Sequence, residues 1–148
     1  MKRVFFYVVL SCVILASCNN SAKDPTDVTA IMQDSSKYTT IKWKDTAIDF
    51  GAKKTGEIVN LTFVCINTGN KPLYLFEVHP SCGCTLVDYS KAPIAPGQQG
   101  KIDAQFDTKK SHSPEVHKTI FVRTNSNDPS RYLSFSGTVI SDSSTAKN

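Results

Sequence analysis

Short runs of β-branched and aromatic residues, separated by turn residues, fill the chain from Ile41 to Ile140. Such runs favour extended strands, whereas the Pro, Gly and Asn residues between them favour turns and loops. No part of this region carries a convincing helical period. The chain is therefore expected to be all-β. The expected strands lie at one or two places within 42–51, at 58–66, at 73–79, from Thr85 onward, and at 100–108, 117–125 and 131–140.

The number and spacing of these strands narrow the architecture. About seven strands in roughly 100 residues, with turns every eight to twelve positions, are typical of an immunoglobulin-like antiparallel β-sandwich. A chain of this size buries an adequate core on its own. We predict a single domain at 41–141, followed by a polar tail at 142–148. The apolar residues of 58–66 that are expected to share one face of a strand are Val59, Leu61, Phe63 and Cys65.

The first residues have the character of a secretory signal. Two positive charges precede an apolar run at 4–16, which is too short for a comfortable membrane span. The residues Leu-Ala-Ser-Cys at 15–18 resemble the bacterial lipobox, in which cleavage falls before the cysteine and its sulfur receives diacylglycerol. We predict a lipoprotein signal peptide at 1–17 and lipid attachment at Cys18, with acyl chains such as palmitate holding the mature chain at a membrane. An ordinary signal peptide or an uncleaved anchor helix is the alternative.

The segment 18–40 is rich in Ser, Thr, Asp and Asn, and we expect it to form a flexible tether with, at most, a short helix around 28–33. Removing Lys2 and Arg3 with the signal leaves 15 of the 17 basic residues against 13 acidic ones, a net charge of +2. So weak a positive charge gives no basis for nucleic-acid binding. The expected location is the bacterial cell envelope, with the lipid in the outer membrane.

Several motifs follow one another along the chain: IDFG at 48–51, GEIVNLTFVCINTGNKPL at 56–73, SCGCT at 81–85, APGQQGKI at 95–102, RTNSNDP at 123–129 and LSFSGTV at 133–139. In this order they resemble one bacterial family, the domain of unknown function 1573 (DUF1573). The resemblance extends over 42–140. It implies an immunoglobulin-like fold, related in shape to the major sperm protein and hydin-type domains and frequent among lipoproteins, with no agreed activity. Relatives of this shape mostly act as interaction modules, which is an analogy at the level of fold.

The stretch His-Pro-Ser-Cys-Gly-Cys-Thr at 79–85 contains the candidate site. Once the signal is removed and the first cysteine is lipidated, three cysteines remain, and an odd number in an oxidising compartment indicates one pair and one leftover. We expect Cys82 and Cys84 to pair as a candidate disulfide and Cys65 to be the buried leftover. In an extended strand the two Cα atoms would lie roughly 6.5 to 7 Å apart, so the bond needs a bend, which Gly83 permits. So small a ring would be strained and easily reduced.

Three interpretations of this stretch remain open. The cysteines can pack or pair at a corner between two strands. They can instead capture Cu(I) as a metal site made by Cys82, Cys84 and His79, because two soft sulfurs and an imidazole are suitable ligands. The third interpretation is thiol and disulfide exchange, against which stands the absence of a Cys-x-x-Cys motif and of a thioredoxin-like alternation of strands and helices. His112 and His117 are expected to be exposed residues of a hairpin loop.

No motif of a known catalytic type is found, such as Gly-x-Ser-x-Gly, a phosphate-cradling glycine loop or His-Glu-x-x-His. We therefore expect a protein that is not an enzyme and needs no cofactor. The predicted function is a membrane-tethered binding module for a protein or an envelope polymer, working through an exposed sheet edge or the loops at one end. The alternative is a periplasmic copper-binding or thiol-redox protein. Thr46, within Asp-Thr-Ala, is a weak candidate for O-glycosylation.

Overall fold

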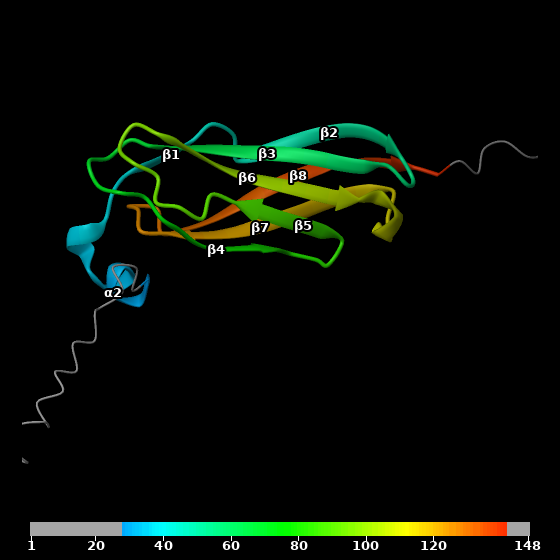
Figure 1. The fold of residues 1–148 in the computed structure, drawn as a ribbon. Coiled ribbons are helices and arrows are strands. Elements are labelled where there is room, and N and C mark those ends of the chain that lie inside the picture. Colours follow the sequence, from blue (N-terminus) through cyan, green and yellow to red (C-terminus); the bar gives the residue numbers. More distant parts are fainter. Residues whose placement is uncertain (1–27, 142–148) are drawn as a thin grey trace, which may run out of the picture.

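The computed structural model describes residues 28–141. Within them it contains short helical segments and eight strands (Figure 1). None of the helices in this part of the chain is long and apolar enough to cross a membrane. The predicted signal peptide at 1–17, the lipid attachment at Cys18 and the tail at 142–148 lie outside the described residues. The elements are α2 (Val28–Gln33), the 3-10 helix η1 (Ser35–Lys37), β1 (Ile41–Trp43), β2 (Ala47–Lys54), β3 (Ile58–Asn67), β4 (Leu75–Pro80), β5 (Thr85–Tyr89), β6 (Gln99–Asp107), the 3-10 helix η2 (Thr108–Lys110), β7 (Glu115–Thr124) and β8 (Ser130–Ile140).

The strands form two sheets that face each other in two layers (Figure 1). One sheet has the order β1-β3-β6-β5 and the other has the order β2-β8-β7-β4. Along the longer strands, buried residues alternate with exposed ones, as a core enclosed between two sheets requires. The prediction of an all-β, immunoglobulin-like sandwich is confirmed, with eight strands in place of about seven.

The core between the sheets is made of aliphatic and aromatic side chains. The four residues that were predicted to share one face of 58–66 are all buried on β3. Phe106 of β6 is fully buried, and its ring centroid lies 5.9 Å from that of Phe50 on β2 and 5.6 Å from that of Phe135 on β8. Tilted rings at such distances attract each other beyond their area of burial. These three rings therefore join the two sheets at the centre of the sandwich.

The first predicted strand region, 42–51, is divided between the two sheets. β1 pairs antiparallel with β3, whereas β2 crosses to the other sheet and pairs parallel with β8. The other strand pairs of the described domain are antiparallel. An apolar and polar alternation tells which face a strand buries but not the direction of its neighbour, so the parallel pair had no signal in the sequence. The chain therefore passes from one sheet to the other between β1 and β2, at 44–46.

The strand β2 continues past Gly51, where the sequence was expected to end it. Gly51 has a φ of +70°, in the region that favours glycine, and the register with β8 shifts between Asp49 and Ala52. Gly51 is therefore part of a bulge within β2. On the facing strand, a Cβ at Gly137 would lie 2.5 Å from the Gly51 carbonyl oxygen. The absence of a side chain at Gly137 thus allows the bulged strand to come close to β8.

Asn125 holds the loops at the end of the sandwich next to α2, which we call the proximal end (34–40, 67–73, 90–98 and 124–130). Its side chain is 1% exposed. The Nδ2 atom donates to the carbonyl oxygens of Lys37 and Pro72, both at 2.9 Å. The Oδ1 atom accepts from the Tyr74 N–H at 2.7 Å. One side chain therefore ties three separate loops together.

Asn67, at the end of β3 in the other sheet, has the same role. It is fully buried, and its Nδ2 donates to the carbonyl oxygens of Lys71 at 2.7 Å and Ile94 at 2.8 Å. Its Oδ1 accepts from the Thr39 hydroxyl at 2.9 Å and from the Gly69 N–H at 3.1 Å. Buried backbone groups need hydrogen-bond partners, and loop residues do not obtain them from strand pairing. The side-chain amides of Asn67 and Asn125 provide these partners.

The folded body begins earlier in the chain than the strand pattern indicated. Thr39 is 5% exposed, its N–H donates to the Asn125 carbonyl oxygen at 3.0 Å, and its own carbonyl oxygen accepts from the Asn127 N–H at 3.0 Å. It also forms an isolated bridge with Ser126. The contacts of Thr39 thus extend the body back into the segment that was expected to be a tether up to residue 40.

Candidate functional site

The two candidate cysteines lie at the corner where the chain passes from β4 to β5, and therefore from one sheet to the other. This corner is part of the distal end of the sandwich (54–57, 80–85 and 107–115), opposite α2 (Figure 1). Cys82 and Cys84 are joined by a disulfide, with their Cα atoms 5.3 Å apart. That distance is shorter than two positions of an extended strand would give, so the chain bends at this point.

Backbone hydrogen bonds hold this corner on both sides. The Ser81 N–H donates to the Thr119 carbonyl oxygen at 2.8 Å, and the Thr119 N–H donates back to the Ser81 hydroxyl at 3.1 Å. On the other side, the Asp107 N–H donates to the Cys84 carbonyl oxygen at 3.0 Å. The corner is thus attached to β7 before the disulfide and to β6 after it.

Gly83 was expected to permit the bend, and the bend forms without a positive φ at this glycine. The glycines with positive φ among residues 28–141 are Gly51, Gly56 and Gly97. A Cβ placed at Gly83 would meet no atom within 4 Å. The bend is therefore made with backbone angles that other residues adopt, and an alanine would fit at this position.

The remaining candidate ligands are not gathered around the two sulfurs. His79 is exposed on β4, where its register partner is Phe121, and His112 and His117 are exposed on the segment before β7 and on β7 itself. Within the described residues, no group of three His, Cys, Asp or Glu side chains is placed to hold a metal ion. In the disulfide form neither sulfur is a thiolate, which is the form that binds Cu(I).

Cys65, the third cysteine of the described residues, is a core side chain on β3. It is fully buried and carries a free thiol. Burial raises the pKa of this thiol, because desolvation disfavours the thiolate more than two backbone hydrogen bonds favour it. Cys65 therefore packs as a small hydrophobic residue, as the sequence indicated.

Four aromatic residues lie on the outer face of the β2-β8-β7-β4 sheet, and we call them the aromatic face (Tyr74, Phe76, Phe121 and Tyr132). Their strand neighbours Leu75, Ile120, Val122 and Leu133 are buried, so the rings point away from the core. The rings of Tyr74 and Phe76 are stacked with centroids 6.0 Å apart, and those of Phe121 and Tyr132 are 5.2 Å apart. Tyr132 is 65% exposed. The sequence analysis missed this face, although the signal was present as aromatic residues at positions that alternate with core residues.

The edge strands beside the corner are β5 and β4, and some of their edge hydrogen-bonding groups are already used within the chain. On β5 the N–H groups of Thr85 and Tyr89 point away from β6, because the pairing uses the alternate residues. The Thr85 N–H donates to the Cys82 carbonyl oxygen at 3.4 Å, and the Tyr89 N–H donates to Asp88 Oδ1 at 2.8 Å. On β4, a register shift lies between Leu75 and Glu77. Bulges and used N–H groups make an edge a poor template for an added strand.

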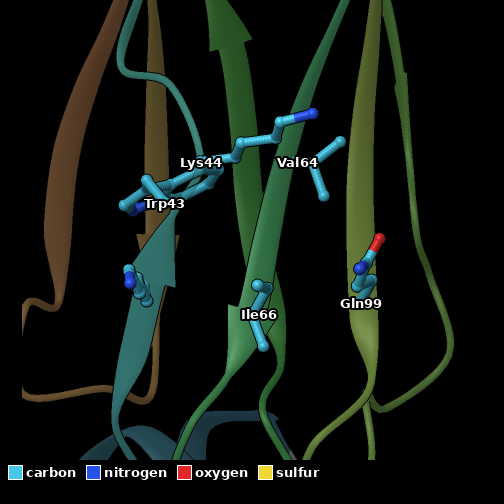
Figure 2. A pocket seen from close by; sticks show the side chains of 6 residues that line it. Trp43, Lys44, Val64, Ile66 and Gln99 are labelled. Carbon is cyan, nitrogen blue, oxygen red and sulfur yellow. The ribbon is translucent and has the colours of Figure 1, made fainter.

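The opposite outer face carries a shallow trough of about 500 Å³ over β1, β3 and β6 (Figure 2). Val64 and Ile66 form its floor, and the side chain of Lys44 reaches across β3 beside Val64. Next to it on β6, Lys101 is engaged in an ion pair with Asp103 at 3.0 Å. A hydrogen bond from the Thr62 hydroxyl, together with Lys101, lowers the pKa of the Asp103 carboxyl. The indole of Trp43 also lines the trough, together with Lys42 and Gln99, so the trough combines one aromatic and two aliphatic side chains with charged and polar ones.

The family model described as "Protein of unknown function (DUF1573)" matches residues 41–139. The chain belongs to this family. The DUF1573 match starts at the first residue of β1 and ends within β8, so it includes both sheets, the disulfide corner and the two asparagines, but not the loop at 34–40 that they hold. No curated protein is similar enough in sequence to count as a relative.

Solved structures share this fold at low sequence identity. A protein of unknown function from Porphyromonas gingivalis W83 aligns with a TM-score of 0.63 and 18% identity over 71% of this chain, which spans 49% of that protein. The seventh PapD-like (ASH) domain of human CEP192 aligns with a TM-score of 0.54 and 12% identity over 71% of this chain and 88% of that domain. The Vibrio cholerae protease VesB aligns with a TM-score of 0.53 and 14% identity over 68% of this chain and 31% of its own. Likenesses at these identities establish the fold and nothing about activity.

Proposed function

We propose that this chain is a bacterial envelope lipoprotein whose DUF1573 domain is a non-catalytic module that binds another protein. The observation that supports the proposal most directly is the aromatic face. Its rings form two contacting pairs on the outer side of the sheet, Tyr74 with Phe76 and Phe121 with Tyr132. Tyr132 is 65% exposed and the other three rings are half-buried. Exposed apolar side chains that gather on one face mark interaction sites in soluble domains.

The composition of this face fits a protein interface. Tyr and Phe are enriched at the centres of interfaces, where burying their rings provides most of the affinity. Arg123 and Glu77 form an exposed ion pair at 3.3 Å on the same sheet, which supplies the polar surroundings that such centres have. Three of the rings stand on strands and Tyr74 directly precedes β4, so little conformational entropy is lost when a partner covers them.

The sheet edge is a weaker candidate than this face. A partner that added a strand to β5 would need N–H groups along its edge, but those of Thr85 and Tyr89 are already used within the chain. We therefore assign partner binding to the aromatic face and not to strand addition at the corner.

Site-specific photo-crosslinking tests the binding proposal. We expect a photoreactive amino acid at position 132 of the full chain to crosslink to one defined envelope protein, and Phe121→Ala to reduce the yield at least about tenfold, since a central ring of an interface contributes about 2 kcal/mol or more. The matched control is position 86, because Leu86 is 70% exposed on the opposite sheet against 65% for Tyr132. Equal yields from the two positions would refute the assignment. A crosslink to a glycan instead of a protein would favour an envelope polymer as the partner.

The lipid anchor has its own test. We expect the mature chain to start at Cys18 and to carry acyl chains, because the preceding residues resemble a lipobox and two or more chains hold a protein at a membrane. Intact mass spectrometry of the native protein measures this directly, and a Cys18→Ser variant should move from the membrane fraction to the soluble fraction. An unacylated mature chain that starts at another residue would contradict the anchor but not the aromatic face.

A further inference from the structure

We propose that the disulfide between Cys82 and Cys84 is an exchange site, which a protein dithiol opens and closes while the domain stays folded. This inference does not rest on the binding function proposed above, because the corner and the aromatic face use different residues. It rests on how the corner is held, on the different surroundings of the two sulfurs, and on one hydroxyl group that lies beside both of them.

The disulfide adds little that the corner does not already have. A structural disulfide stabilises most when it closes a long loop, and this one joins residues two positions apart. The segment before it is fixed to β7 through Ser81 and Thr119, and the segment after it is fixed to β6 through Cys84 and Asp107. Opening the bond leaves all of these hydrogen bonds in place. The dithiol form is therefore compatible with the same fold.

The two sulfurs lie in different surroundings. The side chain of Cys84 packs against the hydrophobic core, whereas that of Cys82 does not. Exchange requires that an attacking thiolate reach one sulfur in line with the bond, so access decides which sulfur is attacked. Cys82 is therefore the attacked sulfur, and Cys84 is the leaving sulfur on the inner side.

Thr85 supplies a hydroxyl group to both sulfurs. It is 3% exposed, and its Oγ1 lies 3.8 Å from the sulfur of Cys82 and 3.9 Å from that of Cys84. A hydrogen bond donated to a thiolate favours its charged form and so makes it a better leaving group. Thr85 is thus a positioning residue for the exchange, placed at the first position of β5.

The reaction is a two-electron exchange in two steps. A thiolate of the partner dithiol attacks the sulfur of Cys82, a mixed disulfide forms, and the bond to Cys84 breaks. The electron pair remains on the Cys84 sulfur, which takes a proton from water. The second thiolate of the partner then attacks the partner's first sulfur in the mixed disulfide. The bond to Cys82 breaks, Cys82 leaves as a thiolate that takes a proton from water, and the partner becomes a disulfide. The reverse sequence closes the corner again.

Reduction of the full chain by dithiothreitol tests the proposal, with each cysteine read separately by alkylation and peptide mass mapping. We expect Cys82 and Cys84 to become alkylated at a rate within about threefold of the rate in guanidinium, while the circular dichroism of the sheets stays unchanged. The buried Cys65 is an internal control, and it should stay unlabelled until the chain unfolds. If the pair is labelled only together with Cys65, or if the reduced chain loses its sheet signal, the proposal is wrong.

Single-cysteine variants test the direction of attack. In Cys84→Ser, we expect Cys82 to react with an aromatic disulfide reagent at least about tenfold faster than Cys84 does in Cys82→Ser. Equal or reversed rates would overturn the assignment of the attacked sulfur.

Thr85→Val tests the role of the hydroxyl group, because it keeps the shape of the side chain. We expect this substitution to slow reduction of the disulfide. When it is combined with Cys82→Ser, we expect the remaining thiol of Cys84 to become reactive only at a higher pH. An unchanged pH profile would refute the role of the hydroxyl group, because a merely structural role would not affect that profile.

Discussion

Replacing Asn125 with alanine is expected to destabilise the domain by about 3 to 5 kcal/mol, because three backbone groups at the proximal end would lose a buried partner and each costs about 1 to 3 kcal/mol. The affected groups are the carbonyl oxygens of Lys37 and Pro72 and the N–H of Tyr74. The loss acts on three loops together, since one amide connects them. Chemical denaturation of the purified chain measures the change in free energy of unfolding.

Asn127→Ala is the matched control for this variant. Asn127 is exposed two positions away, and its hydrogen bond to the Thr39 carbonyl oxygen uses the backbone N–H, which alanine retains. An exposed substitution of this kind changes stability by no more than about 0.5 kcal/mol. If the two variants had similar free energies of unfolding, the asparagine would not hold the loops in the way described.

Replacing Phe106 with alanine is expected to cost about 3 to 5 kcal/mol, the range found when a buried phenylalanine is truncated and the cavity closes only in part. Phe106 is fully buried and contacts rings on β2 and β8, so its loss removes contact between the sheets at the centre of the core. Thermal and chemical unfolding measure this effect. The variant should also unfold with a lower midpoint temperature by several degrees or more for a domain of roughly 100 residues.

Tyr132→Ala is the matched aromatic control on the same sandwich. This ring is 65% exposed, so truncation should change stability little while it reduces crosslinking to the partner. Phe106→Ala should show the opposite pattern, a large loss in the free energy of unfolding without removal of any side chain that contacts the partner. A large loss of stability in Tyr132→Ala would mean that the aromatic face has a structural role instead of a binding role.

Much of the fold was predictable because period-two burial is a local property of the chain. The core face of β3 was identified residue by residue from its alternation, and the turn residues separated most strands correctly. The division of 42–51 between two sheets was not predictable, since a strand pattern carries no information on the direction or the sheet of its neighbour. Gly51 was misjudged for a related reason, because a glycine that ends a strand and one that forms a bulge look the same in sequence.

The candidate site was predictable only in part. The sequence singled out Cys82 and Cys84 as a pair. The bend forms without the positive φ that a glycine such as Gly83 would allow, and His79 is not gathered with the sulfurs into a metal site among the described residues. The aromatic face went unnoticed because Tyr74 and Phe76 are more than forty residues from Phe121 and Tyr132 in the sequence, and each ring alone is an ordinary surface residue.

What the sequence determined by itself is the class of fold, the face that each main strand buries, and the two cysteines that meet at a corner. These depend on short-range patterns, which the residues set before any tertiary contact exists. Only the tertiary structure decided the parallel pairing of β2, the inclusion of Thr39 in the body, and the joining of loops by Asn67 and Asn125. Each of these depends on groups distant in sequence that meet only when the sheets pack, where a buried polar group must find a partner.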